Sequence, residues 1–431
     1  MNAVAGTDSL TAVIPGSLVT DHGVEYRLRS TDMTGDVDST DTAVLRVTMP
    51  SMNGTVSIPA ASRGDASDPA FQAQQLSNFR MFSVPVDLGN KSASAVFGAL
   101  NRAVSDTTTR LFRWTGSAYT ESVGNLDPGK AVWIISREAI NILTLEASTS
   151  SSTVDPPTIP INANGFTQIG VPYTFPVPAE SLFSANSHLE QALWEWNPVA
   201  ANYQPAETLV PWHGYWVKND SAVSTMVIPP VDAEALTKPL VTRPVMVPDG
   251  WVLQVQAFAG GVSDLHNYAG VSPEAADRWD RMDVSEPPSF GAGTIGVYFP
   301  HQDWGDKARN YAFDIRTPVT DGHTWDFTVD ALVPNTEASI TVQGIERLPD
   351  GLQVVLFEVE GYRTVNLPME SGLRFETGEQ GRTRTYKLIV GTADYVAGVS
   401  KALLPKTFSL GQNYPNPFNP TTTIFFDLPA S

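Results

Sequence analysis

The chain has 431 residues, with 27 basic and 46 acidic side chains, a formal net charge of −19 and no cysteine. The lack of cysteine excludes disulfides, thiolate metal sites and cysteine nucleophiles, and the negative charge disfavours nucleic acid and anionic membrane surfaces as partners. Hydrophobic residues make up 42% of the chain, and 33 prolines and 32 glycines accompany few long helical periods. This composition predicts a mostly β, multidomain protein.

The N-terminal region, residues 1–49, predicts three short strands at 11–14, 24–29 and 42–48 from alternating apolar residues. It resembles the closing strands of an immunoglobulin-like or fibronectin type III-like domain in the run IPGSLVTDHGVEYRLRSTDMTGDVDSTD. That resemblance implies a partial domain. The region has no basic segment followed by a continuous apolar segment, so it is not a signal peptide. No stretch of 18 apolar residues predicts a membrane span.

Four aspartates crowd one turn of this region: Asp32, Asp36, Asp38 and Asp41. Oxygen-rich clusters of this kind can bind calcium, but the spacing lacks the EF-hand pattern and its closing glutamate. A solvated turn is therefore the favoured interpretation.

The central region, residues 72–230, contains an internal duplication with copies at about 72–147 and 166–230. Each copy predicts a strand, a short amphipathic helix and two strands that carry tryptophan. The matched positions are Trp114 with Trp196, Tyr119 with Tyr203, Leu126 with Leu209, and Trp133 with Trp216. Because these aromatics recur at matched positions, core packing is their favoured role.

Three aromatic residues of the second copy are candidates for carbohydrate binding: Trp194, Trp212 and Tyr215. Sugars stack their C–H faces on aromatic rings that are open to solvent. Trp212 is the best of the three because it falls in a predicted turn and has no aromatic counterpart in the first copy. Core packing is the favoured alternative for all three.

Residues 244–393 predict a β-sandwich, followed by a linker at 394–407. The expected strands are 251–257, 293–298, 311–315, 323–329, 337–343, 353–358 and 385–390. Within this region Asp277, Asp280 and Asp283 are candidate ligands of a structural calcium ion, and a charged surface loop is the favoured alternative. No other cofactor is expected.

No catalytic motif is present in the sequence. The six histidines are dispersed, and HExxH, GxSxG and P-loop patterns are missing. This chain is therefore expected to be non-catalytic.

The C-terminal segment, residues 408–431, contains three X-Pro steps that exclude a helix, followed by an alternating pattern at 422–428 that predicts a strand. No partner for that strand is expected. The segment reads FSLGQNYPNPFNPTTTIFFDLP and resembles the opening of the C-terminal sorting domain of type IX secretion cargo in Bacteroidota. The residues that carry the resemblance are Gln412, Asn413, Tyr414, Pro415, Asn416, Pro417, Phe418, Asn419 and Pro420.

The resemblance implies export across the outer membrane, recognition of the complete sorting domain by the translocon, and a secreted or cell-surface location. It also implies a signal peptide upstream of this sequence and a sorting domain truncated after its first strand. The tryptophan-bearing units and the sandwich resemble regions often placed before such domains. The sequence thus favours a non-catalytic spacer, presentation or adhesion region. The alternatives are a carbohydrate-binding module and an accessory region of a secreted hydrolase with an upstream catalytic domain.

Overall fold

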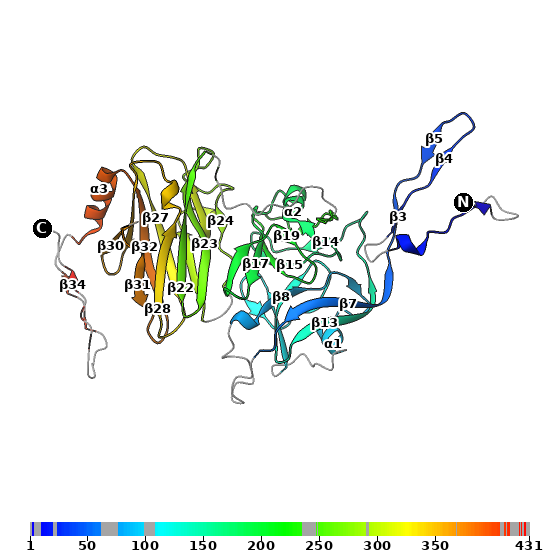
Figure 1. Cartoon of the computed structure of the whole chain (residues 1–431), viewed down its shortest axis with the longest axis horizontal. Helices are drawn as coiled ribbons and strands as arrows, with labels where there is room; N and C mark the ends of the chain where they lie inside the picture. The colour runs from blue at the N-terminus through cyan, green and yellow to red at the C-terminus, as the bar shows by residue number, and fades with distance from the viewer. Residues whose placement is uncertain are drawn as a thin grey trace. The chain divides into compact units, whose positions relative to one another are not determined.

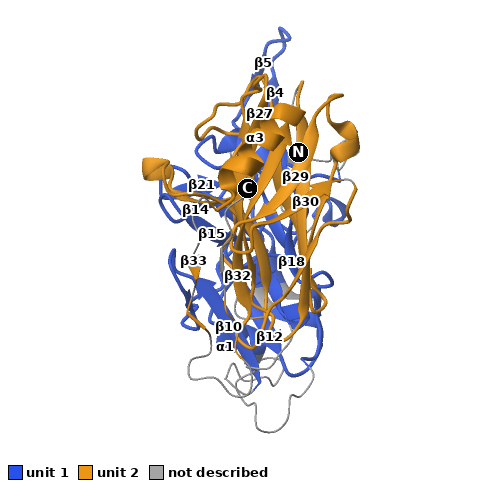
Figure 2. Ribbon diagram, turned by 90° about the vertical axis from the view of Figure 1, so that its left-hand side faces the viewer, with its two compact units in different colours: residues 1–243 blue, residues 244–431 orange. Residues whose placement is uncertain are grey.

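A computed structural model describes residues 2–3, 10–19, 24–61, 76–98, 108–234, 247, 249–289, 293–367, 369–405, 409–410, 412–413, 422, 424 and 426–427. In these residues the chain is mostly β, as predicted. It divides into two compact units, residues 1–243 and 244–431 (Figure 2).

The N-terminal residues form paired strands and one short 3₁₀ helix (Figure 1). β1 (Asn2–Ala3) pairs with β2 (Leu10–Thr11), β3 (Val24–Tyr26) with β6 (Ala43–Leu45), and β4 (Arg29–Thr31) with β5 (Val37–Ser39); η1 is Gly16–Leu18. In β3 Val24 is buried, whereas Tyr26 is exposed. The immunoglobulin-like assignment stays a prediction.

The aspartate-rich turn lies between β4 and β5 and is exposed. Asp32 Oδ1 accepts hydrogen bonds from the backbone N–H groups of Thr34 at 2.8 Å and Asp36 at 2.9 Å. The Thr34 hydroxyl also donates to Asp32, and these hydrogen bonds lower the pKa of Asp32. The aspartate side chain therefore organises the turn by itself.

The rest of the first unit consists of two halves, which we call the first half (48–149) and the second half (158–227). The first half contains β7 (Thr48–Ile58), η2 (Leu76–Asn78), β8 (Arg80–Ser83), β9 (Asp87–Leu88), α1 (Ala93–Gly98), β10 (Thr109–Trp114), β11 (Tyr119–Thr120), β12 (Ala131–Ser136) and β13 (Ile140–Thr149). The second contains β14 (Thr158–Pro160), β15 (Phe166–Ile169), β16 (Val177–Pro178), α2 (Ala179–Ala185), β17 (Trp194–Asn197), β18 (Asn202–Pro205), β19 (Thr208–Leu209), β20 (Tyr215–Lys218) and β21 (Thr225–Val227).

The two halves have the same strand order. The first half has a sheet β8-β12-β10-β11, and the second has a sheet β15-β20-β17-β18. In each half the strand that precedes this sheet in the chain pairs with the strand that comes after it, β7 with β13 and β14 with β21. The first half therefore begins at β7, upstream of the predicted boundary at residue 72.

The matched aromatic residues pack across the two halves. Trp133 of β12 in the first half is fully buried and contacts two rings of the second half. Its ring centroid lies 5.2 Å from that of Trp196 and 6.4 Å from that of Tyr203. The Trp133 and Trp196 rings meet edge to face, the geometry that aromatic pairs favour.

The reverse contact involves Trp216, which is the second-half counterpart of Trp133. Trp216 is fully buried, and its ring centroid lies 6.1 Å from that of Trp114 and 6.5 Å from that of Tyr119, both in the first half. Each half thus inserts the same aromatic residues into the other. Trp133 and Trp216 are therefore each covered in part by rings of the opposite half.

The turn before the last sheet strand is the same in both halves. The backbone N–H of Lys130 donates to Asp127 O at 3.2 Å, and that of His213 donates to Val210 O at 3.2 Å. The third residue of each turn has a positive φ, 85° at Gly129 and 74° at Trp212. Glycine adopts this conformation freely, whereas tryptophan there is strained by about 1 kcal/mol or more.

In both turns the third residue faces a residue of a neighbouring strand, and the large and the small residue of this pair swap places between the two halves. In the second half the Trp212 ring lies over Gly54, where an added Cβ would be 2.1 Å from the indole. In the first half Gly129 faces Ile159, where an added Cβ would be 2.5 Å from Ile159 Cδ1. The tryptophan of one turn therefore faces a glycine on a strand, and the glycine of the other turn faces an isoleucine on a strand.

The second unit contains one continuous strand order, β30-β29-β32-β27-β25-β26-β23-β22-β28-β31, with β24 paired to β26. The bounds are β22 (Trp251–Ala259), β23 (Val262–Val271), β24 (Val284–Ser285), β25 (Ile295–His301), η3 (Gly305–Lys307), β26 (Arg309–Arg316), β27 (Gly322–Ala331), β28 (Glu337–Gln343), η4 (Ile345–Arg347), β29 (Gln353–Glu358), β30 (Arg363–Leu367), β31 (Leu373–Glu376) and β32 (Arg382–Gly391). Only β23 and β26 pair in parallel among the described pairs.

This sheet folds back on itself to form a sandwich. Trp251 of β22 packs on Trp325 of β27 with ring centroids 5.9 Å apart, although other strands separate β22 and β27 in the order. Phe375 of β31 similarly reaches Tyr386 of β32 at 6.4 Å. Apolar residues that alternate along the strands fill the space between the layers, as expected for sheets that bury one face.

Helix α3 (Ala393–Leu403) covers the outer face of β29 and β32. Its Val396 packs with Val355, Phe357 and Ile389, all of which are buried. The Thr392 hydroxyl caps the helix by accepting from the backbone N–H of Tyr395 at 3.3 Å. The region predicted as a linker therefore begins with a packed helix.

The C-terminal strand predicted at 422–428 has a partner, which corrects the expectation that it is unpaired. β34 (Phe426–Asp427) pairs with β33 (Ser409–Leu410) in antiparallel orientation. Only two residues of β33 pair, and a strand this short leaves no alternating pattern in the sequence. The proline-rich segment lies between these two strands in the chain.

Candidate functional site

Two of the three carbohydrate-binding candidates lie inside the protein core. Trp194 is 2% exposed and Tyr215 is 0% exposed, so neither offers a face to a sugar. The Tyr215 hydroxyl accepts a hydrogen bond from the backbone N–H of Val210 at 2.8 Å, and burial raises its pKa. Tyr215 belongs to the hydrophobic core of the second half.

Trp212, the favoured surface candidate, is half-buried. It packs against the core of the first half, with its ring centroid 6.3 Å from that of Phe82. One side of the indole also lies over Gly54. Trp212 therefore acts mainly as a contact between the halves.

The calcium candidates Asp280 and Asp283 hold the loop before β24 through its own backbone. Asp283 is 1% exposed and accepts from the N–H groups of Asp280 at 2.9 Å and Ile315 at 3.0 Å. Asp280 accepts from the N–H of Met282 at 2.7 Å. Burial raises the pKa of Asp283 to about 8. The carboxyl oxygens of Asp283 are thus used by backbone donors of this loop and of β26.

Asp277, the third calcium candidate, is exposed. Across the described residues, no three histidine or acidic side chains converge on a position that could hold a metal ion. The calcium assignment for this acidic run stays a prediction.

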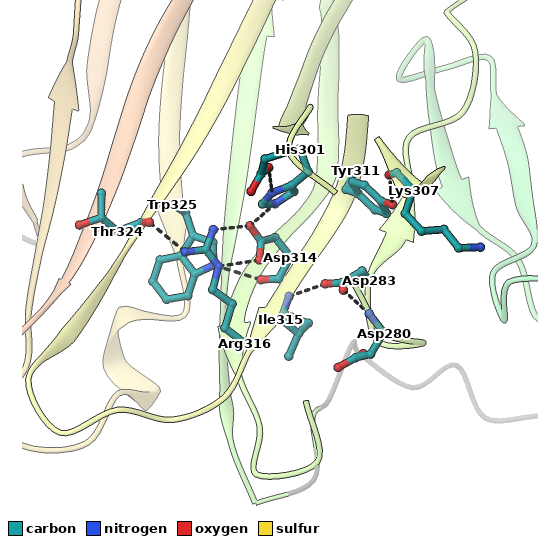
Figure 3. A network of polar contacts seen from close by, with 11 residues as sticks. Asp280, Asp283, His301, Lys307, Tyr311, Asp314, Ile315, Arg316, Thr324 and Trp325 are labelled. Atoms are coloured by element: carbon teal, nitrogen blue, oxygen red, sulfur yellow. Dashed lines mark hydrogen bonds and ion pairs between the residues drawn. The ribbon is translucent and has the colours of Figure 1, made fainter. Parts of the chain in front are cut away.

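A buried ionic network in the sandwich is the main polar cluster that the sequence did not reveal (Figure 3). Asp314 of β26 is fully buried and accepts from Arg316 Nε at 2.9 Å and from another guanidinium nitrogen at 2.7 Å. His301 Nε2 of β25 lies 2.8 Å from Asp314 Oδ2. Burial alone would raise the pKa of Asp314, but the hydrogen bonds from His301 and Arg316 outweigh burial and lower the pKa.

The network also reaches β27. The third Arg316 nitrogen donates to Thr324 O at 3.0 Å, and the guanidinium lies 5.3 Å from the ring centroid of Trp325. Trp325 Nε1 in turn donates to Asp314 O at 3.2 Å. All three guanidinium nitrogens thus have acceptors. The arrangement cross-links β25, β26 and β27.

Two further carboxyl groups lie between β23 and the chain before β25; Asp264 is buried and Glu286 is half-buried. Asp264 accepts from the backbone N–H of Val297 at 2.7 Å, and burial raises its pKa to about 6. Burial also raises the pKa of Glu286 well above its usual value, and the charge of Asp264 adds to this effect. The charge of both groups therefore depends on pH in a range where ordinary carboxyl groups are already ionised.

The structure describes only part of the sorting-signal candidates. Gln412 is exposed, and Asn413 Nδ2 donates to Thr422 Oγ1 at 3.2 Å, across the proline-rich segment. The other candidates, 414–420, lie outside the described residues.

Comparison with known proteins gives no relative. No protein-family model matches the chain, and neither a curated protein nor a solved structure is significantly similar to it. In the described part of the chain, no helix has both the length and the apolar character needed to cross a bilayer.

Proposed function

We propose that this chain is a non-catalytic, modular region of an exported protein that carries the start of a type IX secretion signal. The observation that carries the proposal is the run QNYPNPFNP at 412–420, which resembles the opening of the sorting domain of such cargo. The complete sorting domain would be recognised by the translocon and removed outside the cell. The protein would then be secreted or displayed at the cell surface.

The role proposed for the β units is to space and present the upstream part of the protein. Two observations support it. The candidate aromatic residues Trp194 and Tyr215 are used in packing, and the ionic network around Asp314 links strands. The shared strand order of the two halves supports their interpretation as an internal duplication.

The test is secretion of the full-length gene product from a native type IX host. Deletion of residues 408–431 together with the remaining sorting domain is expected to leave the protein in the periplasm. A double substitution, Tyr414→Ala with Pro417→Ala, is expected to reduce the secreted fraction, because it removes two residues that carry the resemblance. Immunoblots of periplasm, cell surface and medium measure the distribution.

Lys401→Ala is the matched control, since Lys401 is exposed on α3 and lies outside the motif. This variant is expected to be secreted normally. Normal secretion of the deletion variant would contradict the proposal.

A further inference from the structure

A polar pocket of about 580 Å³ lies beside the Asp127–Lys130 turn of the first half. Its volume falls within the range of about 300–1,000 Å³ that is usual for small-molecule sites. Six charged side chains line it, three basic and three acidic: Arg46, Lys91, Lys130, Asp87, Asp127 and Asp155. The pocket is therefore lined by equal numbers of positively and negatively charged side chains.

Five of these side chains form a chain of alternating charges. Asp87 contacts Arg46 at 3.1 Å and Lys91 at 2.8 Å. Asp127 contacts Lys91 at 3.6 Å and Lys130 at 3.0 Å. Hydrogen bonds from Lys91 and Arg46 outweigh burial and lower the pKa of Asp87, so the carboxylate is charged at neutral pH. Hydrogen-bond donors and acceptors thus alternate along the wall of the pocket.

The fold does not require these charges, because the second half builds the same turn without them. Lys91, Asp127 and Lys130 correspond to Val177, Val210 and His213 by strand pairing and turn position. Part-exposed ion pairs of this kind contribute about 0–1 kcal/mol each to stability. A role in binding explains why the first half alone carries them.

We propose that this pocket binds a neutral sugar residue of a glycan. A charged ligand would find no excess of the opposite charge, since the basic and acidic groups are equal in number. A sugar hydroxyl can accept from a lysine ammonium and donate to a carboxylate at the same time, which matches the alternating wall. Pro128, Pro157 and Pro160 also line the pocket, and each is at least partly exposed, so they offer apolar contacts to sugar C–H groups.

The test is calorimetric titration of the full chain with glucose, galactose, mannose and N-acetylglucosamine, and with oligosaccharides that end in these sugars. At least one neutral sugar is expected to bind saturably. Lys91→Met and Asp127→Asn are each expected to weaken binding about tenfold or more, because each removes charge-assisted hydrogen bonds. Binding of oligosaccharides but not of free sugars would identify a glycan end as the ligand and support the proposal.

Lys387→Met is the matched control, since it removes an ion pair with Asp326 in the sandwich. It is expected to leave the affinity unchanged, and thermal unfolding checks that all variants fold. The proposal is overturned if no neutral sugar binds, if both pocket variants bind as the unaltered chain does, or if glucuronate or inorganic phosphate binds in preference to neutral sugars. None of these results depends on export.

Discussion

The two compact units join their β layers with different side chains. Between the halves of the first unit, the contacts centre on tryptophan and tyrosine rings, which need no ionised partner. The sandwich has an apolar core as well, but it also encloses Asp264, Asp283 and Asp314. Ring contacts depend on shape, whereas enclosed carboxyl groups depend on their protonation state. The two units should therefore respond to different perturbations.

The largest effect is expected from the rings between the halves. Trp133→Ala and Trp216→Ala should each lower the free energy of unfolding of the first unit by about 3–5 kcal/mol, the usual cost of removing a buried aromatic side chain. Because the two residues occupy matched positions, their effects should be similar. Urea unfolding followed by circular dichroism measures them.

Milder substitutions, Trp133→Phe and Trp216→Phe, keep an aromatic ring and should cost less than the alanine variants. A large loss for one tryptophan and almost none for the other would contradict the reciprocal contact. The stability of the sandwich should not change in any of these variants.

A smaller and pH-dependent effect is expected in the sandwich. Burial raises the pKa of Asp264 from 3.8 to about 6, so the folded protein holds this proton at pH values where the unfolded chain has lost it. Stability due to this proton is present below pH 4 and is lost as the pH rises through 6. Between pH 4 and pH 7 the free energy of unfolding of Asp264→Asn should therefore rise by about 2 kcal/mol relative to that of the unaltered chain.

Urea unfolding at several pH values measures this gain. Glu286→Gln should show the same direction, since burial also raises the pKa of Glu286. If the free energy of unfolding changes with pH in the same way for the unaltered chain and for Asp264→Asn, the assignment of a buried, protonated carboxyl is contradicted.

The smallest effect concerns the strained backbone at Trp212. Both Trp212→Ala and Trp212→Gly lose the contact with Phe82, but only glycine relieves the positive φ of 74°. Trp212→Gly should therefore be more stable than Trp212→Ala by about 1 kcal/mol. Chemical unfolding of the two variants measures the difference, and an alanine variant of equal or greater stability would count against backbone strain.

Much of the sandwich could be predicted from its apolar patterns. The strands expected at 337–343 and 353–358 coincide with β28 and β29. β23 was missed because its buried positions include Ser263, Asp264 and Asn267, which hide the apolar alternation. Sequence patterns detect a strand by its apolar face, so a strand that buries polar groups escapes them.

The polar clusters could not be predicted for a different reason. His301 and Asp314 come from neighbouring strands and are brought together by a side-chain contact that the strand pairing does not imply, since the register places His301 opposite Arg309. The recurrence of Trp133 and Trp216 did predict a role in packing. It did not reveal which rings of the opposite half each one contacts, because repeat spacing carries no information on individual partners.

Helix α3 limits where the chain can be cut without damage to the sandwich. This helix covers Val355, Phe357 and Ile389. A protease that removed the helix would expose these apolar residues to water. Such patches promote aggregation. Cleavage after Leu404 would leave the cover in place. A cut that leaves the sandwich intact must therefore fall beyond Leu404.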